Sequence, residues 1–82
     1  MAELLGAPKY KGLLITSADS IHETCYYGLY NRHTDCPVLY GILLVFHCNV
    51  TNQPDSQIAL HPSGQIYIRG FYGGSWQDWV EL

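Results

Sequence analysis

Fixed positive charge is scarce in this chain of 82 residues, which has four Lys and Arg side chains against seven Asp and Glu. The cations are scattered along the sequence, so neighbouring positions form no basic patch. Proteins that bind a phosphate backbone need such a patch, because phosphate contacts supply much of their affinity. With a net charge of -3, the sequence argues against nucleic acid as a partner. The four cations are Lys9, Lys11, Arg32 and Arg69.

The chain also has an odd number of cysteines and no long apolar run. Its three cysteines, Cys25, Cys36 and Cys48, cannot all pair within one chain, which argues against a secreted framework held by disulfides. Residues 1–5 carry an early acid and no long apolar run, so they do not fit a signal peptide. The apolar residues 38–46 fall far short of the ~20 residues that cross a bilayer. We therefore expect reduced thiols and no membrane insertion.

Apolar residues, in contrast, are abundant for so small a protein. They make up 48% of the chain, and charged residues make up only 13%. A single domain of this size buries only about 60% of the surface that its unfolded chain exposes. The composition therefore predicts that some apolar surface is hidden by association with other copies.

The first half of the chain shows short β-type segments and little helix. Residues 1–11 have neither helical nor strand periodicity, so we interpret them as an arm or a truncated linker before a domain of residues 12–82. Residues 13–16 predict a short strand, and Ser17 can then cap one helical turn. A strand at residues 24–30 follows, before a polar loop that ends at Pro37.

The second half predicts the centre and the edge of a sheet. Residues 38–46 are continuously apolar, which favours a central strand covered on both faces. A turn at residues 49–56 precedes a hairpin of two further strands, residues 57–61 and 65–69. Together these patterns predict a mainly β fold of about five short strands with at most one short helical turn.

The last predicted strand alternates, and the chain then reverses. Tyr67 and Arg69 are predicted on one face of this strand, and Ile66 and Ile68 on the other. We expect Arg69 to lie at the surface. The glycine pair at residues 73–74 permits a tight turn. Trp76 and Trp79 are then expected to fold back over the apolar end of the sheet, which would hold the tail in place.

Several short motifs follow one another in a distinctive order. An early strand has a Gly-x-Tyr step, a loop carries a proline, and three strands carry Gly-x-Leu-Leu-Val, Gln-Ile and Gly-x-x-Tyr-x-Arg before a closing Trp-x-x-Trp. In this order they resemble the knob domain at the ends of tail fibres in bacteriophages and phage-tail-like bacteriocins, often called the pyocin knob. The segments are Gly28-Leu29-Tyr30, Cys36-Pro37, Gly41-Ile42-Leu43-Leu44-Val45, Gln57-Ile58, Gly64-Gln65-Ile66-Tyr67-Ile68-Arg69 and Trp76-Gln77-Asp78-Trp79.

The resemblance implies a distal, homotrimeric module of a virion tail fibre, made in the bacterial cytoplasm and joined to an upstream fibre shaft. Such a module attaches to a receptor on the bacterial surface, commonly a glycan, without catalysis. The alternative within the same fold is a purely structural module that caps or trimerises the fibre.

Aromatic and planar polar side chains near the C-terminus predict where a glycan would bind. A sugar ring stacks on an aromatic plane, and carboxylate or guanidinium groups bind its hydroxyls. The alternative is that the tryptophans cap the core and the arginine pairs with an acid. The candidate glycan-binding residues are Tyr67, Arg69, Tyr72, Trp76 and Asp78.

Metal binding and catalysis find little support in the sequence. His22, Cys25, Cys36, His47 and Cys48 offer nitrogen and sulfur ligands, but their spacing lacks the two close pairs typical of structural zinc. No signature of a cysteine nucleophile surrounds any of the thiols, and no pair of acids is predicted on facing strands. We therefore expect no metal, no cofactor and no enzymatic activity.

Overall fold

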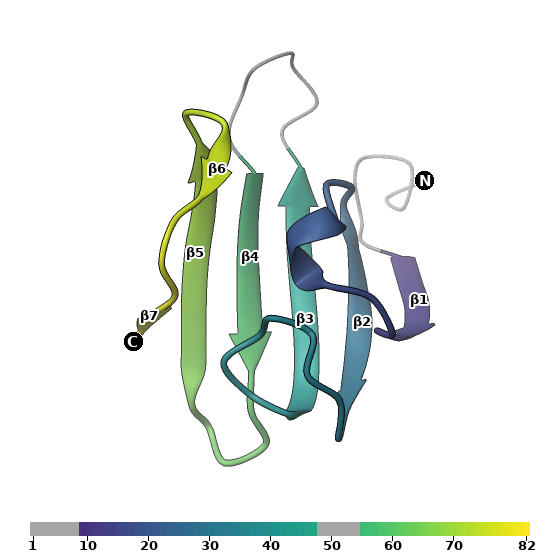
Figure 1. Ribbon diagram of the computed structural model, residues 1–82. Coiled ribbons are helices and arrows are strands. Elements are labelled where there is room, and N and C mark those ends of the chain that lie inside the picture. The colour runs from purple at the N-terminus through teal and green to yellow at the C-terminus, as the bar shows by residue number, and fades with distance from the viewer. Residues whose placement is uncertain (1–8, 48–54) are drawn as a thin grey trace, which may run out of the picture.

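The computed structural model describes residues 9–47 and 55–82, which form one sheet with a short 3-10 helix against it (Figure 1). The sheet has seven strands, slightly more than expected, and the last two are only two residues long. The mainly β fold with one helical turn is therefore confirmed. The elements are β1 (Lys9–Leu13), η2 (Ala18–Ser20), β2 (Cys25–Tyr30), β3 (Tyr40–His47), β4 (Asp55–Leu60), β5 (Ile66–Tyr72), β6 (Ser75–Trp76) and β7 (Val80–Glu81).

The strands lie side by side almost in chain order. The order across the sheet is β1-β2-β3-β4-β5-β6, and β7 pairs with β5 beside β6. The β1–β2 pair is parallel, with η2 in the connection, whereas the other pairs are antiparallel. The first strand starts at Lys9, earlier than the predicted residues 13–16. The predicted turn at residues 49–56 lies mostly outside the described residues.

One face of the sheet is covered by η2 and by the loop of residues 31–39, which both lie in front of the strands in Figure 1. Ser17 caps the helical turn as predicted, since its hydroxyl accepts a hydrogen bond from the Asp19 N–H at 3.1 Å. The Ala18 N–H donates to Thr34 O at 2.8 Å, which joins the turn to the loop. The apolar core under this cover consists of Leu14, Ala18, Cys25, Leu29, Val38, Leu43, Val45 and Ala59.

The opposite face of the sheet carries no comparable cover in the described part of the chain. Leu43 and Val45 in β3 are fully buried, whereas Ile42 and Phe46 are each 41% exposed. β3 is an interior strand as predicted, but the expectation that both its faces are covered is wrong. The reason is that η2 and its loop form a thin layer, which can cover only one side of the sheet (Figure 1).

We call this second side the open face, defined by the outward side chains of β2 to β5. Their registers place them in rows across the sheet, such as the row Tyr26, Leu44, Ile58 and Ile68. None of these outward residues is charged. They are Tyr26, Gly28, Tyr30, Tyr40, Ile42, Leu44, Phe46, Ser56, Ile58, Leu60, Ile66, Ile68, Gly70 and Tyr72.

The C-terminal segment is held along β5. Gly73 and Gly74 adopt positive φ angles of 66° and 85°, which reverses the chain as the glycine pair predicts. The Gln77 N–H donates to Gly70 O and the Leu82 N–H to Ile66 O, both at 2.8 Å. These bonds fix both ends of the segment against the strand. No helix among the described residues is long and apolar enough to span a membrane.

Candidate functional site

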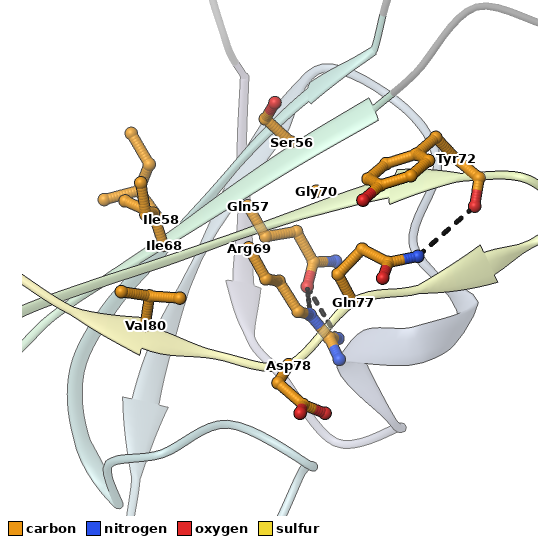
Figure 2. Close-up of a pocket in the computed structure, with 10 residues that line it drawn as sticks. All are labelled: Ser56, Gln57, Ile58, Ile68, Arg69, Gly70, Tyr72, Gln77, Asp78 and Val80. Atoms are coloured by element: carbon orange, nitrogen blue, oxygen red, sulfur yellow. Dashed lines mark hydrogen bonds between the residues drawn. The ribbon is translucent and has the colours of Figure 1, made fainter.

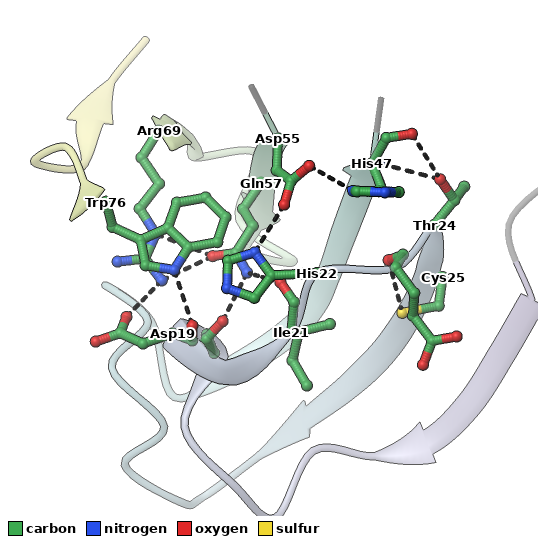
Figure 3. A network of polar contacts seen from close by, with 12 residues as sticks. Asp19, Ile21, His22, Thr24, Cys25, His47, Asp55, Gln57, Arg69 and Trp76 are labelled. Carbon is green, nitrogen blue, oxygen red and sulfur yellow. Dashed lines mark hydrogen bonds and ion pairs between the residues drawn. The ribbon is translucent and has the colours of Figure 1, made fainter. Parts of the chain in front are cut away.

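A buried arginine organises the covered side of β5. The Arg69 Nε and one terminal nitrogen donate to Gln57 Oε1 at 2.9 and 2.7 Å, and that terminal nitrogen also donates to Asp19 Oδ1 at 2.7 Å (Figure 3). The guanidinium carbon lies 4.4 Å from the ring centroid of Trp76 and 4.5 Å from that of Trp79. Both distances are within the range of cation–π attraction. Arg69 thus joins strand, helix and C-terminal segment.

Arg69 is only 9% exposed, so the expectation that it lies at the surface is wrong. Ile68, on the other face of the strand, is 36% exposed. The assignment failed because Gln57 and Asp19 compensate the buried cation, and neither partner is close to Arg69 in the sequence. Gln57 is itself fully buried and donates through its amide nitrogen to Ala18 O at 2.7 Å, so its polar head has partners on both sides.

Both tryptophans fold back over the covered face, as predicted. The Trp76 Nε1–H donates to Asp19 O at 2.9 Å, and the Trp79 Nε1–H donates to Asp35 O at 3.0 Å. Trp79 also packs against the apolar core. The indole rings therefore bind the C-terminal segment to η2 and to the loop that follows β2.

A carboxylate flanked by two histidines lies beside this network. Asp55 Oδ2 is 2.7 Å from Nδ1 of His22, and Asp55 Oδ1 is 2.6 Å from Nδ1 of His47 (Figure 3). Asp55 is 3% exposed, and the sequence had placed it in a turn rather than in a strand. The His22 ring stacks on Trp76 with centroids 5.3 Å apart. This arrangement ties the segment before β2 to the adjoining ends of β3 and β4.

Three of the residues considered as zinc ligands have other partners. His22 and His47 both contact Asp55, and the Cys25 thiol donates to Glu23 O at 3.3 Å. Among residues 9–47 and 55–82, no three His, Cys, Asp or Glu side chains are grouped as metal ligands. Cys48 lies outside the described residues.

Both described thiols favour their protonated form. Burial raises the pKa of Cys25 above its ordinary value, and the negative charge of Glu23 raises it further. Burial likewise raises the pKa of Cys36, although its contact with Thr34 and the positive charge of Arg69 act in the opposite direction. Since the thiolate is the reactive species, these cysteines are poor nucleophiles at neutral pH.

A groove of about 420 Å³ lies beside β5, toward the end where β5 meets β6 (Figure 2). It is hollow because Ser56 and Gly70, which face each other across β4 and β5, are small. The apolar side chains of the next row border this hollow. The residues that line the groove are Ser56, Gln57, Ile58, Ile68, Arg69, Gly70, Tyr72, Gln77, Asp78 and Val80.

Aromatic and polar groups stand together at this groove. Tyr72 is 62% exposed, and Asp78 is exposed without an ion pair to any described residue. The Gln77 side-chain nitrogen donates to Tyr72 O and to Ser75 O, each at 3.4 Å, and the first of these bonds is dashed in Figure 2. This orients the amide and leaves its oxygen as an acceptor. The groove is mainly apolar, and the side chains of its lining residues include an aromatic ring, an amide, a carboxylate and a serine hydroxyl.

The structure divides the predicted glycan-binding residues between two places. Tyr72 and Asp78 line the groove. Tyr67, Arg69 and Trp76 belong to the covered side, where Tyr67 packs against the core and the other two are held by Asp19. Arg69 borders the groove too, but its guanidinium is already engaged by Gln57 and Asp19 (Figure 2).

Ser56 and Gln77 are among the groove residues that were missed from the sequence. Ser56 was assigned to a turn, although it lies within β4 opposite Gly70. Gln77 was regarded only as a spacer between the tryptophans. The signal for Ser56 lies in the pairing of strands, because the register sets it opposite the equally small Gly70 and leaves a hollow.

No family model, curated protein or solved structure matches this chain. The resemblance to the pyocin knob therefore stays a prediction from the motifs in the sequence.

Proposed function

We propose that this chain is a non-catalytic attachment module that binds a saccharide in the groove beside β5. The observation that carries the proposal is the exposed ring of Tyr72 at a concave site that Gln77 and Asp78 also line. Carbohydrate recognition needs this combination, because sugars present apolar ring faces and many hydroxyl groups at once.

Each groove residue has a distinct role in this proposal. Tyr72 stacks on the apolar face of one sugar ring, and Asp78 accepts hydrogen bonds from its hydroxyls. The oxygen of Gln77 accepts a further hydroxyl, and Ser56 can donate or accept. A volume of about 420 Å³ is at the small end for ligand sites, so the groove suits a short segment of a glycan.

The biological setting that we propose is the knob of a tail fibre. The order of the motifs supports a module at the end of a phage or bacteriocin fibre, which contacts a glycan receptor on the bacterial surface. In this setting the knob is a homotrimer at the end of the fibre shaft, and residues 1–11 connect the shaft to the knob. Several identical weak sites on one rigid fibre bind a repeating polymer strongly through their high effective concentration.

The alternative proposal is a purely structural module that caps or trimerises a fibre. Such a structural module has the same fold as the saccharide-binding module, but it needs no ligand at the groove. A glycan array, followed by solution binding of any oligosaccharide that it identifies, separates the two proposals.

Substitution of groove residues tests the binding proposal. We expect Tyr72→Ala and Asp78→Asn each to weaken binding of a soluble oligosaccharide at least about tenfold, since each removes one stacking or hydrogen-bonding group. Tyr10→Ala is the matched control, because Tyr10 is a comparably exposed tyrosine on β1, 58% exposed. Calorimetry or ligand-observed NMR measures the affinity, and a thermal melt checks folding.

Two outcomes contradict the proposal. One is that no glycan on the array binds the folded protein. The other is that Tyr72→Ala and Asp78→Asn both bind as tightly as the parent chain, which would place the ligand elsewhere.

A further inference from the structure

We propose that the end of the open face away from the groove is a self-association surface, and that a second copy of this chain occupies it. We call this surface the tyrosine end. It lies where β2 finishes and β3 begins, and it continues across the adjoining ends of β4 and β5 to the C-terminus. Its residues are Tyr30, Tyr40, Ile42, Leu60, Ile66 and Leu82.

Strand register brings these side chains together. Tyr30 faces Tyr40 directly across β2 and β3, and their rings meet edge to face with centroids 5.7 Å apart. The next row holds Ile42, Leu60 and Ile66. Leu82 continues that row, since its N–H donates to Ile66 O in the register set by β5 and β7. The result is one continuous apolar surface.

This surface is exposed to an unusual degree for large apolar residues. Tyr30 is 67% exposed, Leu82 72%, Tyr40 43%, Ile42 41% and Ile66 36%. A lone exposed apolar residue needs no explanation, but a contiguous patch marks an interaction site. Tyrosine is well suited to such a site, because it buries a large area and has few rotatable bonds to immobilise.

The absence of charge on the outward residues favours a second copy as the occupant. An uncharged surface is compatible with itself, so symmetric packing brings no like charges together. A strongly charged partner would find no complementary group among the outward side chains of β2 to β5. An anionic membrane is disfavoured as well, since the chain carries a net charge of -3 and only four Lys and Arg residues.

The area available suits a reversible complex. We take about 200 Å² for a fully exposed aromatic side chain and somewhat less for an aliphatic one. The exposed parts of the tyrosine end then amount to roughly 500 Å² per copy. Two copies bury roughly 1,000 Å² in total, which is the lower limit for a specific interface. We therefore expect association that depends on protein concentration.

The tyrosine end and the saccharide groove occupy neighbouring rows of the open face, since Ile58 and Ile68 line the groove and Leu60 and Ile66 form the next row. The groove lies toward the opposite ends of β4 and β5, around Ser56 and Gly70. Sheets that pack face to face lie about 10 Å apart, which is enough for interdigitated side chains. A symmetric complex of this kind places one groove on each copy. The surface is compatible with a complex of two or three copies, and the resemblance to the tail-fibre knob implies three.

Sedimentation equilibrium across a dilution series of the chain tests this proposal. We expect the parent protein to associate between about 10 μM and 1 mM, and we expect Tyr30→Lys and Ile42→Lys to remain monomeric over that range. Ile15→Lys is the matched control, because Ile15 is 68% exposed and lies outside the tyrosine end. Circular dichroism and a melt establish that each variant folds.

A parent chain that stays monomeric up to about 1 mM overturns the proposal. Association that Tyr30→Lys and Ile42→Lys leave intact while folded overturns it too, as does a monomer that binds neutral lipid vesicles through this surface. The saccharide proposal fails separately, since folded monomeric Tyr30→Lys should still bind a soluble oligosaccharide with the parent affinity. Loss of self-association without loss of that binding is the result that supports both proposals.

Discussion

At the scale of single residues, Arg69 has the greatest consequence for the fold. A buried cation is costly unless its hydrogen bonds are satisfied, and Gln57 and Asp19 satisfy them here. The rings of Trp76 and Trp79 also lie within 4.5 Å of its guanidinium carbon. Since the Asp19 side chain is 54% exposed, its ion pair is screened by solvent, and the buried contact with Gln57 contributes more to stability.

Arg69→Ala is expected to lower the free energy of unfolding by about 2–3 kcal/mol. The physical reason is that Gln57 Oε1 loses its donors in a site that water does not reach. Urea denaturation measures the change. The matched control is Arg32→Ala, which removes an exposed arginine and should change stability by less than about 0.5 kcal/mol. Equal effects from the two substitutions would contradict a structural role for the Arg69 network.

At the scale of elements, the β3–β4 pair depends on one glycine. Gly41 has a φ of 127°, and a Cβ built at this position would lie 1.8 Å from Leu60 O. No side chain can be accommodated against backbone of the adjacent strand at that distance. Gly41 therefore sets how closely β3 and β4 approach each other beside the tyrosine end.

We expect Gly41→Ala to destabilise the protein by about 3 kcal/mol or more, because it forces the two strands apart as well as straining the backbone. Gly73→Ala is the control. Gly73 also has a positive φ, 66°, but no atom lies within 4 Å of an added Cβ, so we expect a loss of only about 1–2 kcal/mol. Chemical denaturation compares the two variants, and a smaller loss for Gly41→Ala would show that the strands can separate at little cost.

At the scale of the whole molecule, the pKa shifts of four side chains have the same direction, since each pKa is raised. Burial is the leading cause that raises the pKa of Cys25, Tyr27 and Cys36, and the hydrogen bond to Glu23 raises the pKa of Lys11. Each of these groups keeps its proton more firmly in the folded state than in the unfolded state. Their contribution to stability is therefore complete below the ordinary pKa values and is lost as the pH rises through the folded ones.

The folded protein should accordingly lose stability as the pH rises from about 8.5 to about 11. Urea denaturation at several pH values in this range measures the loss. Cys25→Ala removes one of the buried acids, so its stability should fall less steeply with pH than that of the parent, whatever its stability at pH 8. A free energy of unfolding that stays constant or rises in this range would contradict the raised pKa values of these groups in the folded state.

The sequence by itself determined most of the elements and their approximate order, although the first strand was placed too late and the two-residue strands β6 and β7 were missed. Strand alternation, the cap at Ser17 and the glycine pair at residues 73–74 are local signals, and each gave the observed local structure. The inward return of Trp76 and Trp79 was also predictable, because large aromatic side chains at a chain end are strongly driven to bury their surface.

Only the tertiary structure decided which face of the sheet is covered. Along β5, alternation separates Arg69 from Ile68, but it cannot say which one faces the core, since that depends on where Asp19 and Gln57 lie. Strand pairing likewise created the groove by setting Ser56 opposite Gly70, and the tyrosine end by setting Tyr30 opposite Tyr40. Periodicity is a property of neighbouring residues, whereas burial and concavity depend on contacts between segments that are distant in the sequence.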